Sequence, residues 1–276
     1  MLIRNFLLVI FTFCIHLQVF SQVPAMHNTA FAEGEQLTYQ INFYSFITGS
    51  VRAGNFELIV AGEKTSINNQ NTFHCIARGR TQWAFDFFYK VNDRFESFID
   101  ESSLLPLLAL RRIQETDYIR NQDLVFDQGN HKATFKDNLK GVTRVISTSS
   151  ATLDLLSAVY YLRAMELSPA DQTRDVQISY IFSDSLRSAT IKFLGTETLQ
   201  TAHGKVNCIK IQPQVIKGSV FKATYPLTVW ISNDKNRIPV LVESEIVMGK
   251  VRVELVSWAG LRNPFSALIT QKQTKK

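Results

Sequence analysis

The sequence predicts a mainly β protein in which two pseudo-repeated antiparallel β units form a sandwich, or an open or half barrel, around one buried central helix. Three observations support this fold class. A single segment has the pattern of a long helix, and that helix has almost no polar face. The segments on both sides of it have the apolar and polar patterns of strands. These two arms also repeat each other at a constant distance along the chain.

The first 21 residues have the features of a secretory signal peptide. Arg4 is the single cation before an apolar stretch at residues 6–20, and Ser21 is small, as signal peptidase requires. We expect cleavage before Gln22, with residues 23–25 as a second site, and therefore a periplasmic or secreted protein. The apolar stretch is shorter than a membrane-spanning helix and no second one follows, so no transmembrane anchor is predicted.

The repeat relates a first β unit, residues 22–150, to a second β unit, residues 169–262. Cys75 and Cys208 occur in similar short motifs that are 208 − 75 = 133 residues apart, and Pro106 and Pro239 are 239 − 106 = 133 residues apart. Several such matches without a gap indicate an internal duplication. The clearest strands are expected at residues 55–61, 95–100, 190–194, 227–232 and 247–257.

The central helix is predicted within residues 151–168. Side-chain oxygens of Ser149, Ser150 or Thr152 can cap its first turn, Asp154 lies where the helix dipole favours an anion, and Ser168-Pro169 ends it. Because apolar residues occur on nearly all sides of this segment, we expect the helix to be buried between the two units.

The charge of the chain is moderately positive. The formal net charge is +6, and it becomes 6 − 1 = +5 once Arg4 is removed with the signal peptide. Residues 263–276 form a basic tail that ends in Lys272, Lys275 and Lys276. A solvated tail is the simplest interpretation, and a patch for nucleic acid or membrane is the alternative. We expect no nucleic-acid partner.

An aromatic segment supplies the candidate ligand-binding residues. If residues 83–91 form a strand, their odd-numbered side chains share one face. The second unit has no aromatic residue at the matching positions, so the fold does not require this stripe in both copies. The stripe can line one wall of an apolar cavity, or it can be ordinary core. The predicted ligand-binding residues are Trp83, Phe85, Phe87, Tyr89 and Phe95.

The strand that follows the stripe carries charged side chains among apolar ones. Arg94 can pair with Asp93 or with Glu96, or these groups can bind a polar head group. A salt bridge on an edge strand is the simpler interpretation.

The sequence contains no recognisable reactive centre. Cys75 and Cys208 remain after the signal peptide is removed, and they can form a disulfide between the units or stay as buried thiols. The histidines have no metal-ligand spacing, and no nucleophile, phosphate-loop or dinucleotide motif is present. We therefore predict no metal, no cofactor and no catalytic residue, and the sequence supports no reaction class.

Several segments carry a family resemblance. They are residues 34–39 (GEQLTY), 91–97 (VNDRFES), 153–163 (LDLLSAVYYLR), 229–234 (VWISND) and 237–240 (RIPV). These segments resemble the exported bacterial family called domain of unknown function 3108, over about residues 31–258. The resemblance implies a β-rich periplasmic protein with a signal peptide, and it brings no known activity, ligand or catalytic residue.

These observations lead to two main functional hypotheses. The first is an exported, non-enzymatic envelope protein that binds a lipid or other hydrophobic ligand in an apolar cavity between its units. The alternative is a structural or interaction protein that presents sheet edges or the basic tail to an envelope protein partner. A hydrolase is a third interpretation, and it requires titratable residues that converge in a cleft.

Overall fold

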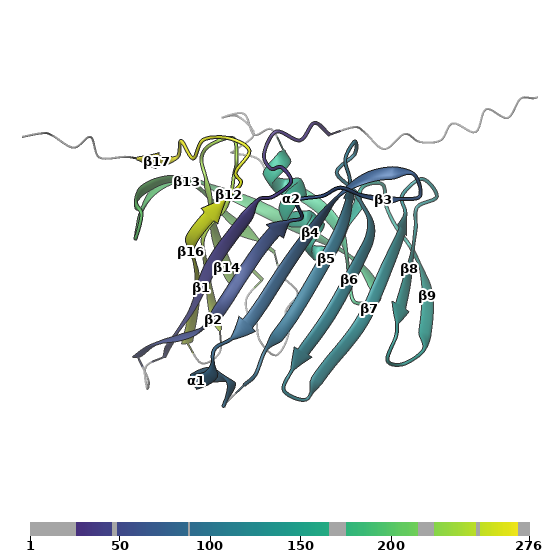
Figure 1. Cartoon of the computed structure of the whole chain (residues 1–276), viewed down its shortest axis with the longest axis horizontal. Helices are drawn as coiled ribbons and strands as arrows, with labels where there is room; N and C mark the ends of the chain where they lie inside the picture. The colour runs from purple at the N-terminus through teal and green to yellow at the C-terminus, as the bar shows by residue number, and fades with distance from the viewer. Residues whose placement is uncertain are drawn as a thin grey trace, which may run out of the picture.

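The structure is a computed structural model, and it describes residues 26–45, 49–87, 89–165, 175–214, 224–246 and 249–269. The predicted signal peptide lies outside these ranges. Among the described residues, 17 strands form one sheet, and helix α2 (Leu155–Ala164) packs against strands from both units (Figure 1). The prediction of a mainly β fold around a central helix is confirmed.

The elements follow the two predicted units. The first unit contains β1 (Gln36–Ser45), β2 (Gly49–Val60), β3 (Thr65–Ile67), β4 (Gln70–Thr81), α1 (Trp83–Asp86), β5 (Asn92–Asp100), β6 (Pro106–Glu115), β7 (Tyr118–Asp127), β8 (Lys132–Asp137) and β9 (Val142–Ser147). After it come β10 (Thr152–Leu153), α2, β11 (Val176–Phe182), β12 (Ser185–Thr201), β13 (Gly204–Pro213), β14 (Leu227–Ser232), β15 (Pro239–Ile246), β16 (Gly249–Ala259) and β17 (Leu268–Ile269).

Strand β1 joins the two units into one sheet, because it pairs with β2 on one side and with β16 on the other. From β1 the ladder runs through β2, β4, β5, β6, β7 and β8 to β9 in one direction. In the other direction it runs through β16, β15, β14, β13, β12 and β11 to β10. The short strands β3 and β17 add to β4 and β13.

The sheet is open, since no pairing joins β9 to β10 in the described part of the chain. It nevertheless curls until its ends approach. Arg144 of β9 forms an ion pair with Asp184 in the turn between β11 and β12. Ile181 of β11 packs in one apolar cluster with Ala109 and Phe126 from the opposite end of the sheet. Side chains rather than backbone hydrogen bonds therefore close the curl.

The sequence repeat is visible in the order of the strands. Adding 133 to the bounds of β4 gives residues 203–214, which match β13 (Gly204–Pro213), and β6 and β15 both begin at the matched prolines. The pairing register differs, however. Cys75 lies opposite Ser97, and an identical register would place Cys208 opposite residue 97 + 133 = 230, whereas it lies opposite Ser232. Residues at the same offset can therefore face opposite sides of the sheet.

The two cysteines show this difference directly. Cys75 is buried beside α2 in a cluster with Tyr160, whereas Cys208 is buried in a different cluster with Trp230. Both are free thiols, so the disulfide alternative is not realised. Burial raises the pKa of both thiols, which keeps them protonated and unreactive at neutral pH.

Asp154 begins the central helix. Its carboxylate Oδ1 accepts hydrogen bonds from Leu156 N (2.8 Å) and Ser157 N (3.1 Å), and Ser157 Oγ accepts one from Asp154 N (2.8 Å). The other carboxylate oxygen accepts a hydrogen bond from Ser97 Oγ of β5 at 2.7 Å. This reciprocal capping box connects the start of the helix to the sheet.

The predicted cap and start of the helix are therefore wrong. The caps expected at Ser149, Ser150 or Thr152 do not form, because Thr152 belongs to β10 and pairs in parallel with β11. The helix ends at Ala164, and the expected stop at Ser168-Pro169 lies outside the described residues. The predicted burial holds for most of its length, since six of its ten residues are buried: Leu156, Ser157, Ala158, Tyr160, Arg163 and Ala164.

Part of the predicted tail belongs to the fold. Asn263 Nδ2 donates to Thr29 O at 2.8 Å, Ala267 is buried, and β17 pairs with β13. The backbone of residues 263–269 therefore packs on the sheet, while the terminal lysines lie outside the described ranges.

A buried ion pair holds the other end of α2. Arg163 is 2% exposed and Glu35 is 0% exposed, and the guanidinium donates two hydrogen bonds to the carboxylate at 2.7 and 2.8 Å. Arg163 Nε also donates to Asn236 O at 3.1 Å, in the connection between β14 and β15. Burial alone would lower the pKa of Arg163, but the Glu35 carboxylate raises it, so the pair stays charged.

Removing one member of this pair is expected to destabilise the fold strongly. Arg163→Met leaves the Glu35 carboxylate buried without its partner, which typically costs about 3–5 kcal/mol. Urea unfolding of the purified protein measures the change.

Two further variants make this prediction specific. Arg144→Met removes an exposed pair and is expected to cost less than about 1 kcal/mol. The double replacement Glu35→Leu and Arg163→Met removes both charges and is expected to recover part of the loss. The prediction fails if Arg163→Met costs no more than Arg144→Met.

Candidate functional site

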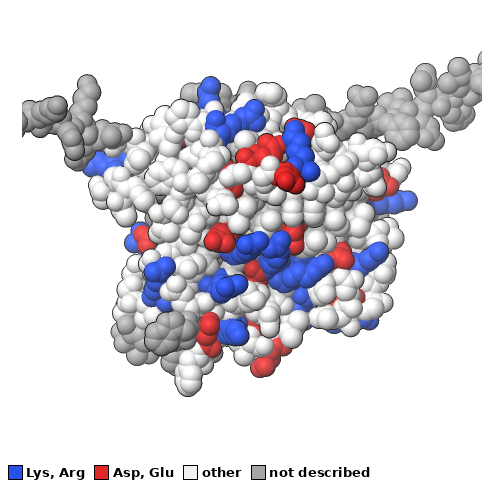
Figure 2. Space-filling view, in the orientation of Figure 1, with Lys and Arg blue, Asp and Glu red and all other residues white. Residues whose placement is uncertain are grey.

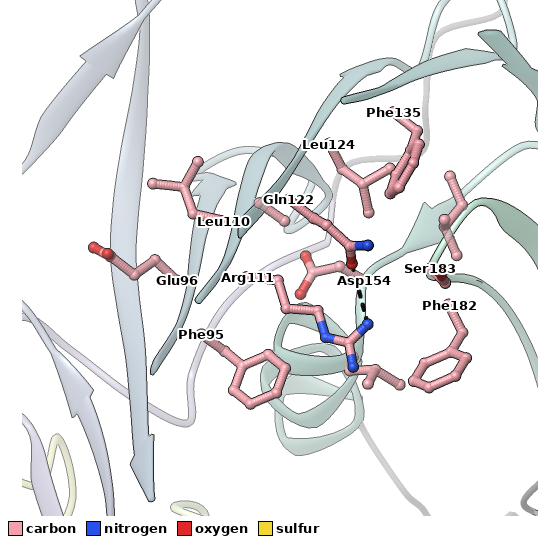
Figure 3. Close-up of a pocket in the computed structure, with 13 residues that line it drawn as sticks. Phe95, Glu96, Leu110, Arg111, Gln122, Leu124, Phe135, Asp154, Phe182 and Ser183 are labelled. Atoms are coloured by element: carbon pink, nitrogen blue, oxygen red, sulfur yellow. Dashed lines mark hydrogen bonds between the residues drawn. The ribbon is translucent and has the colours of Figure 1, made fainter. Parts of the chain in front are cut away.

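A small cleft lies on the concave face of the sheet, between β5–β8, the start of α2 and the end of β11 (Figure 3). Its volume is about 40 Å³, which holds roughly three water molecules. Side chains of alternate residues on β6 and β7 point into it, and the opposed pair Ala109 and Leu124 leaves room because alanine is small. The lining residues are Phe95, Glu96, Ala109, Leu110, Arg111, Gln122, Leu124, Phe135, Asp154, Leu155, Ile181, Phe182 and Ser183.

Arg111 is the one cationic side chain in this lining. Its guanidinium carbon lies 6.0 Å from the ring centre of Phe95 and 5.3 Å from that of Phe182, so two aromatic rings flank it (Figure 3). Arg111 Nη1 donates a hydrogen bond to Gln122 Oε1 at 3.2 Å. Its Nε is buried and has no hydrogen-bond partner. The site therefore offers a desolvated positive charge with unused donor capacity.

The acidic group of the cleft is already engaged. Asp154 is buried, and its oxygens accept hydrogen bonds from the first turn of α2 and from Ser97. Burial raises the pKa of Asp154, although these hydrogen bonds lower it. Asp154 therefore has a structural role, and it leaves the Arg111 charge uncompensated.

The chemistry of the cleft favours binding rather than catalysis. No nucleophile lies hydrogen-bonded to a base among its lining residues. Across the described ranges, no three His, Cys, Asp or Glu side chains come together in a way that could hold a metal ion. The same ranges include no helix that is long and apolar enough to cross a membrane. An apolar wall with a flanked guanidinium suits a molecule that has an apolar part and an acidic group.

The structure places the five predicted ligand-binding residues in different environments. Phe95 lines the cleft, and none of Trp83, Phe85, Phe87 and Tyr89 does. Phe85 packs edge-on against Phe43 with ring centres 6.3 Å apart. Phe87 is 87% exposed and Tyr89 is 44% exposed. Their role in ligand binding stays a prediction.

The predicted aromatic strand does not form. Residues 83–86 are helix α1, which connects β4 to β5, because Gln82 O accepts hydrogen bonds from Phe85 N and Asp86 N. Thr81 Oγ1 donates to Asp86 and accepts from Val91 N, which closes the connection. Alternation of aromatic residues predicted the wrong period here, because local hydrogen bonds favour a helical turn.

Sequence reasoning missed Arg111, Gln122 and Phe182. They come from β6, β7 and β11, so tertiary pairing alone brings them together. One signal was present in the sequence: Arg111 falls on the same strand face as Ala109 and Ile113, and a cation on an apolar face is unusual.

The predicted pairing of Arg94 with Glu96 is confirmed. Arg94 Nε and Nη2 donate to the two carboxylate oxygens at 2.7 and 3.0 Å, and Arg94 lowers the pKa of Glu96. His74 Nε2 lies 2.7 Å from the same carboxylate. The strand is not at a sheet edge, however, since β5 lies between β4 and β6.

Asp93 forms a separate acidic cluster near α1. Its Oδ1 accepts a hydrogen bond from Gln114 N at 3.0 Å, and Tyr89 OH donates to Glu115 Oε2 at 2.6 Å. Burial, followed by the nearby Glu115 carboxylate, raises the pKa of Asp93 from 3.8 to about 6. The hydrogen bond to Glu115 raises the pKa of Tyr89 to about 12.

Asp93 gives the protein a pH-dependent stability. Because its pKa is higher in the folded state, its protonation stabilises the fold below about pH 4, and this contribution is lost as the pH rises through about 6. Asp93→Asn removes the titration, so the fall in the urea midpoint between about pH 4 and about pH 7 should be smaller than in wild type. Asp117→Asn, in the exposed turn after β6, should keep the wild-type fall. An unchanged fall in Asp93→Asn contradicts the assignment.

Comparison with solved structures finds related folds at low sequence identity. A β-barrel-like protein of domain of unknown function 1849 from Brucella abortus has a TM-score of 0.54 and 10% identity, and the match covers 83% of this chain and 98% of that chain. A Bacteroides fragilis protein described as exported, with a YmcC-like fold, has a TM-score of 0.34 and 10% identity, with 85% and 99% covered. The first likeness supports a barrel-like fold.

No curated protein is significantly similar to the sequence. The model of the family described as "Protein of unknown function (DUF3108)" matches residues 38–256, which span nearly all of the described sheet. The resemblance inferred from the sequence motifs is thereby confirmed, and the chain belongs to the domain of unknown function 3108 family.

Proposed function

We propose that this protein is an exported, non-enzymatic binder of an amphiphilic ligand, whose apolar part enters the concave cleft and whose acidic group pairs with Arg111. The observation that supports this most is the state of Arg111. Its Nε is buried without a partner, and its charge is flanked by Phe95 and Phe182 rather than by a carboxylate. A carboxylate or phosphate supplied by a ligand would satisfy these donors.

The ligand would have to widen the cleft, because about 40 Å³ is too small for an acyl chain. The seam between the curled ends of the sheet supports such a change. Side-chain contacts close it, chiefly the Arg144 to Asp184 ion pair and the cluster around Ile181. Phe182 and Ser183 lie at this seam and also line the cleft, so a small movement of the β11–β12 turn would enlarge it.

The aromatic residues around α1 are a second part of the proposal. Trp83, Phe85, Phe87 and Tyr89 would contact a ligand beyond the cleft, at the other end of α2 from the ion pair or at the mouth of the curl. The high exposure of Phe87 supports this role, since a large apolar side chain in water gains free energy when a partner covers it.

Removing the Arg111 charge is expected to weaken binding of acidic amphiphiles selectively. With a fluorescent fatty-acid probe, Arg111→Gln should lower the affinity about tenfold, because a hydrogen bond to a charged group is worth about 1.5–3 kcal/mol. The methyl ester of the same probe should bind both proteins equally. Titration of probe fluorescence gives both affinities.

Arg120→Gln serves as the matched control, because Arg120 lies over Tyr118 and does not line the cleft. It should bind both probes as wild type does. If wild type binds neither probe and carries no lipid after gentle purification, the ligand proposal is wrong. A single dominant partner in cellular crosslinking would then support the alternative of a structural or interaction protein of the envelope.

Export is proposed on the N-terminal sequence alone. The mature chain recovered from a periplasmic or secreted fraction should begin at Gln22, as measured by mass spectrometry of its N-terminal peptide. A chain that retains residues 1–21 and stays in the cytoplasm would contradict this localisation.

A further inference from the structure

We propose that the convex face of the first unit carries a second, separate site that binds phosphate-type oxyanions through Arg78, Arg80 and Arg94. The site rests on the pairing of β4, β5 and β6. Arg78 lies directly opposite Arg94, and Arg94 lies directly opposite Arg112. Because neighbouring strands are about 4.8 Å apart, the three side chains arise within about 10 Å of each other.

This arrangement is costly for the fold when nothing is bound. Like charges directly opposite each other destabilise a sheet. Glu96 compensates Arg94, and Asp123 compensates Arg112 at 2.7 Å. Arg78 and Arg80 are exposed and form no hydrogen bond or ion pair with any described residue, and Glu57, opposite Arg78 on β2, forms none with it either. Two guanidinium groups are thus left with all their donors unused.

A hollow in the surface coincides with these free side chains. Its volume is about 410 Å³, roughly ten times that of the concave cleft. Asn55 and Asn92 add amides to it, and Asn55 Oδ1 already accepts a hydrogen bond from Arg52 at 2.9 Å, which leaves its Nδ2 as a donor. Figure 2 shows Lys and Arg side chains gathered across the middle of this face.

The composition of the hollow favours an oxyanion. Planar guanidinium groups bind phosphate through two parallel hydrogen bonds, and a hollow with several such donors selects a ligand with several oxygens. Two acids also line it, Glu57 and Asp93, but the Asp93 carboxylate is directed to Gln114 N. A free phosphate ion and the phosphate of a lipid head group share the chemistry that this site recognises.

The site is independent of the amphiphile cleft. Side chains alternate between the two faces of a strand, so Arg111 points to the concave face and Arg112 to the convex one. Removing Arg78 and Arg80 should therefore leave probe binding at Arg111 unchanged, and the failure of either proposal does not affect the other.

The test uses inorganic phosphate in one arm and vesicles in the other. Wild type is titrated with phosphate by calorimetry, and it is sedimented with phosphatidylglycerol vesicles and with phosphatidylcholine vesicles. The double variant Arg78→Gln and Arg80→Gln is compared with Arg187→Gln and Lys205→Gln, which remove two exposed cations from β12 and β13 of the second unit. Urea unfolding establishes that both variants remain folded.

We expect the Arg78 and Arg80 variant to lose about tenfold in affinity and the control variant to bind as wild type does. Binding should weaken at about 1 M salt, where the Debye length falls to about 3 Å. A loss in both arms identifies a site for free phosphate, and a loss with phosphatidylglycerol vesicles alone identifies a lipid head group. No binding in either arm, or an equal loss in the control variant, overturns the proposal.

Discussion

The buried pair of Arg163 and Glu35 is the interaction on which the rest of the structure depends. A charge without access to water is tolerated only when a partner neutralises it, so three segments distant in sequence must meet at one place. These are the segment before β1, the end of α2 and the connection that contains Asn236. Asp154 and Ser97 hold the other end of the helix against β5. Because α2 is held at both ends, its first turn is fixed beside the cleft.

The continuous sheet explains why the protein has two chemically different faces. Strand β1 pairs with both units, and the sheet curls without closing, so its concave side is largely covered by α2 and its convex side stays in water. Period-two alternation then sends adjacent residues to different surroundings. Arg111 lies between aromatic rings in the cleft, whereas Arg112 continues the row of arginines outside. One short sequence therefore contributes to both proposed sites.

Much of the architecture was predictable from local patterns. The matched prolines begin equivalent strands, the apolar helix is buried, and Arg94 pairs with Glu96, because each of these follows from residue type and short-range spacing. The candidate site was less predictable. Of the five aromatic residues expected to bind ligand, only Phe95 lines the cleft, since a helical turn at α1 breaks the stripe in which the others were placed. The cleft itself depends on Ile181 and Phe182, which reach it from the far end of the sheet.

The sequence by itself determined the β-rich class, the duplicated strand order, the single buried helix and the family to which the chain belongs, because hydrophobic periodicity and short motifs are local properties. Tertiary structure decided the pairing register, the cap of α2 and the surroundings of each thiol and arginine. A shift in pairing that the sequence repeat does not record places Cys208 away from the helix that covers Cys75. Register is set by the summed packing of many distant side chains, and for that reason it cannot be read from any one segment.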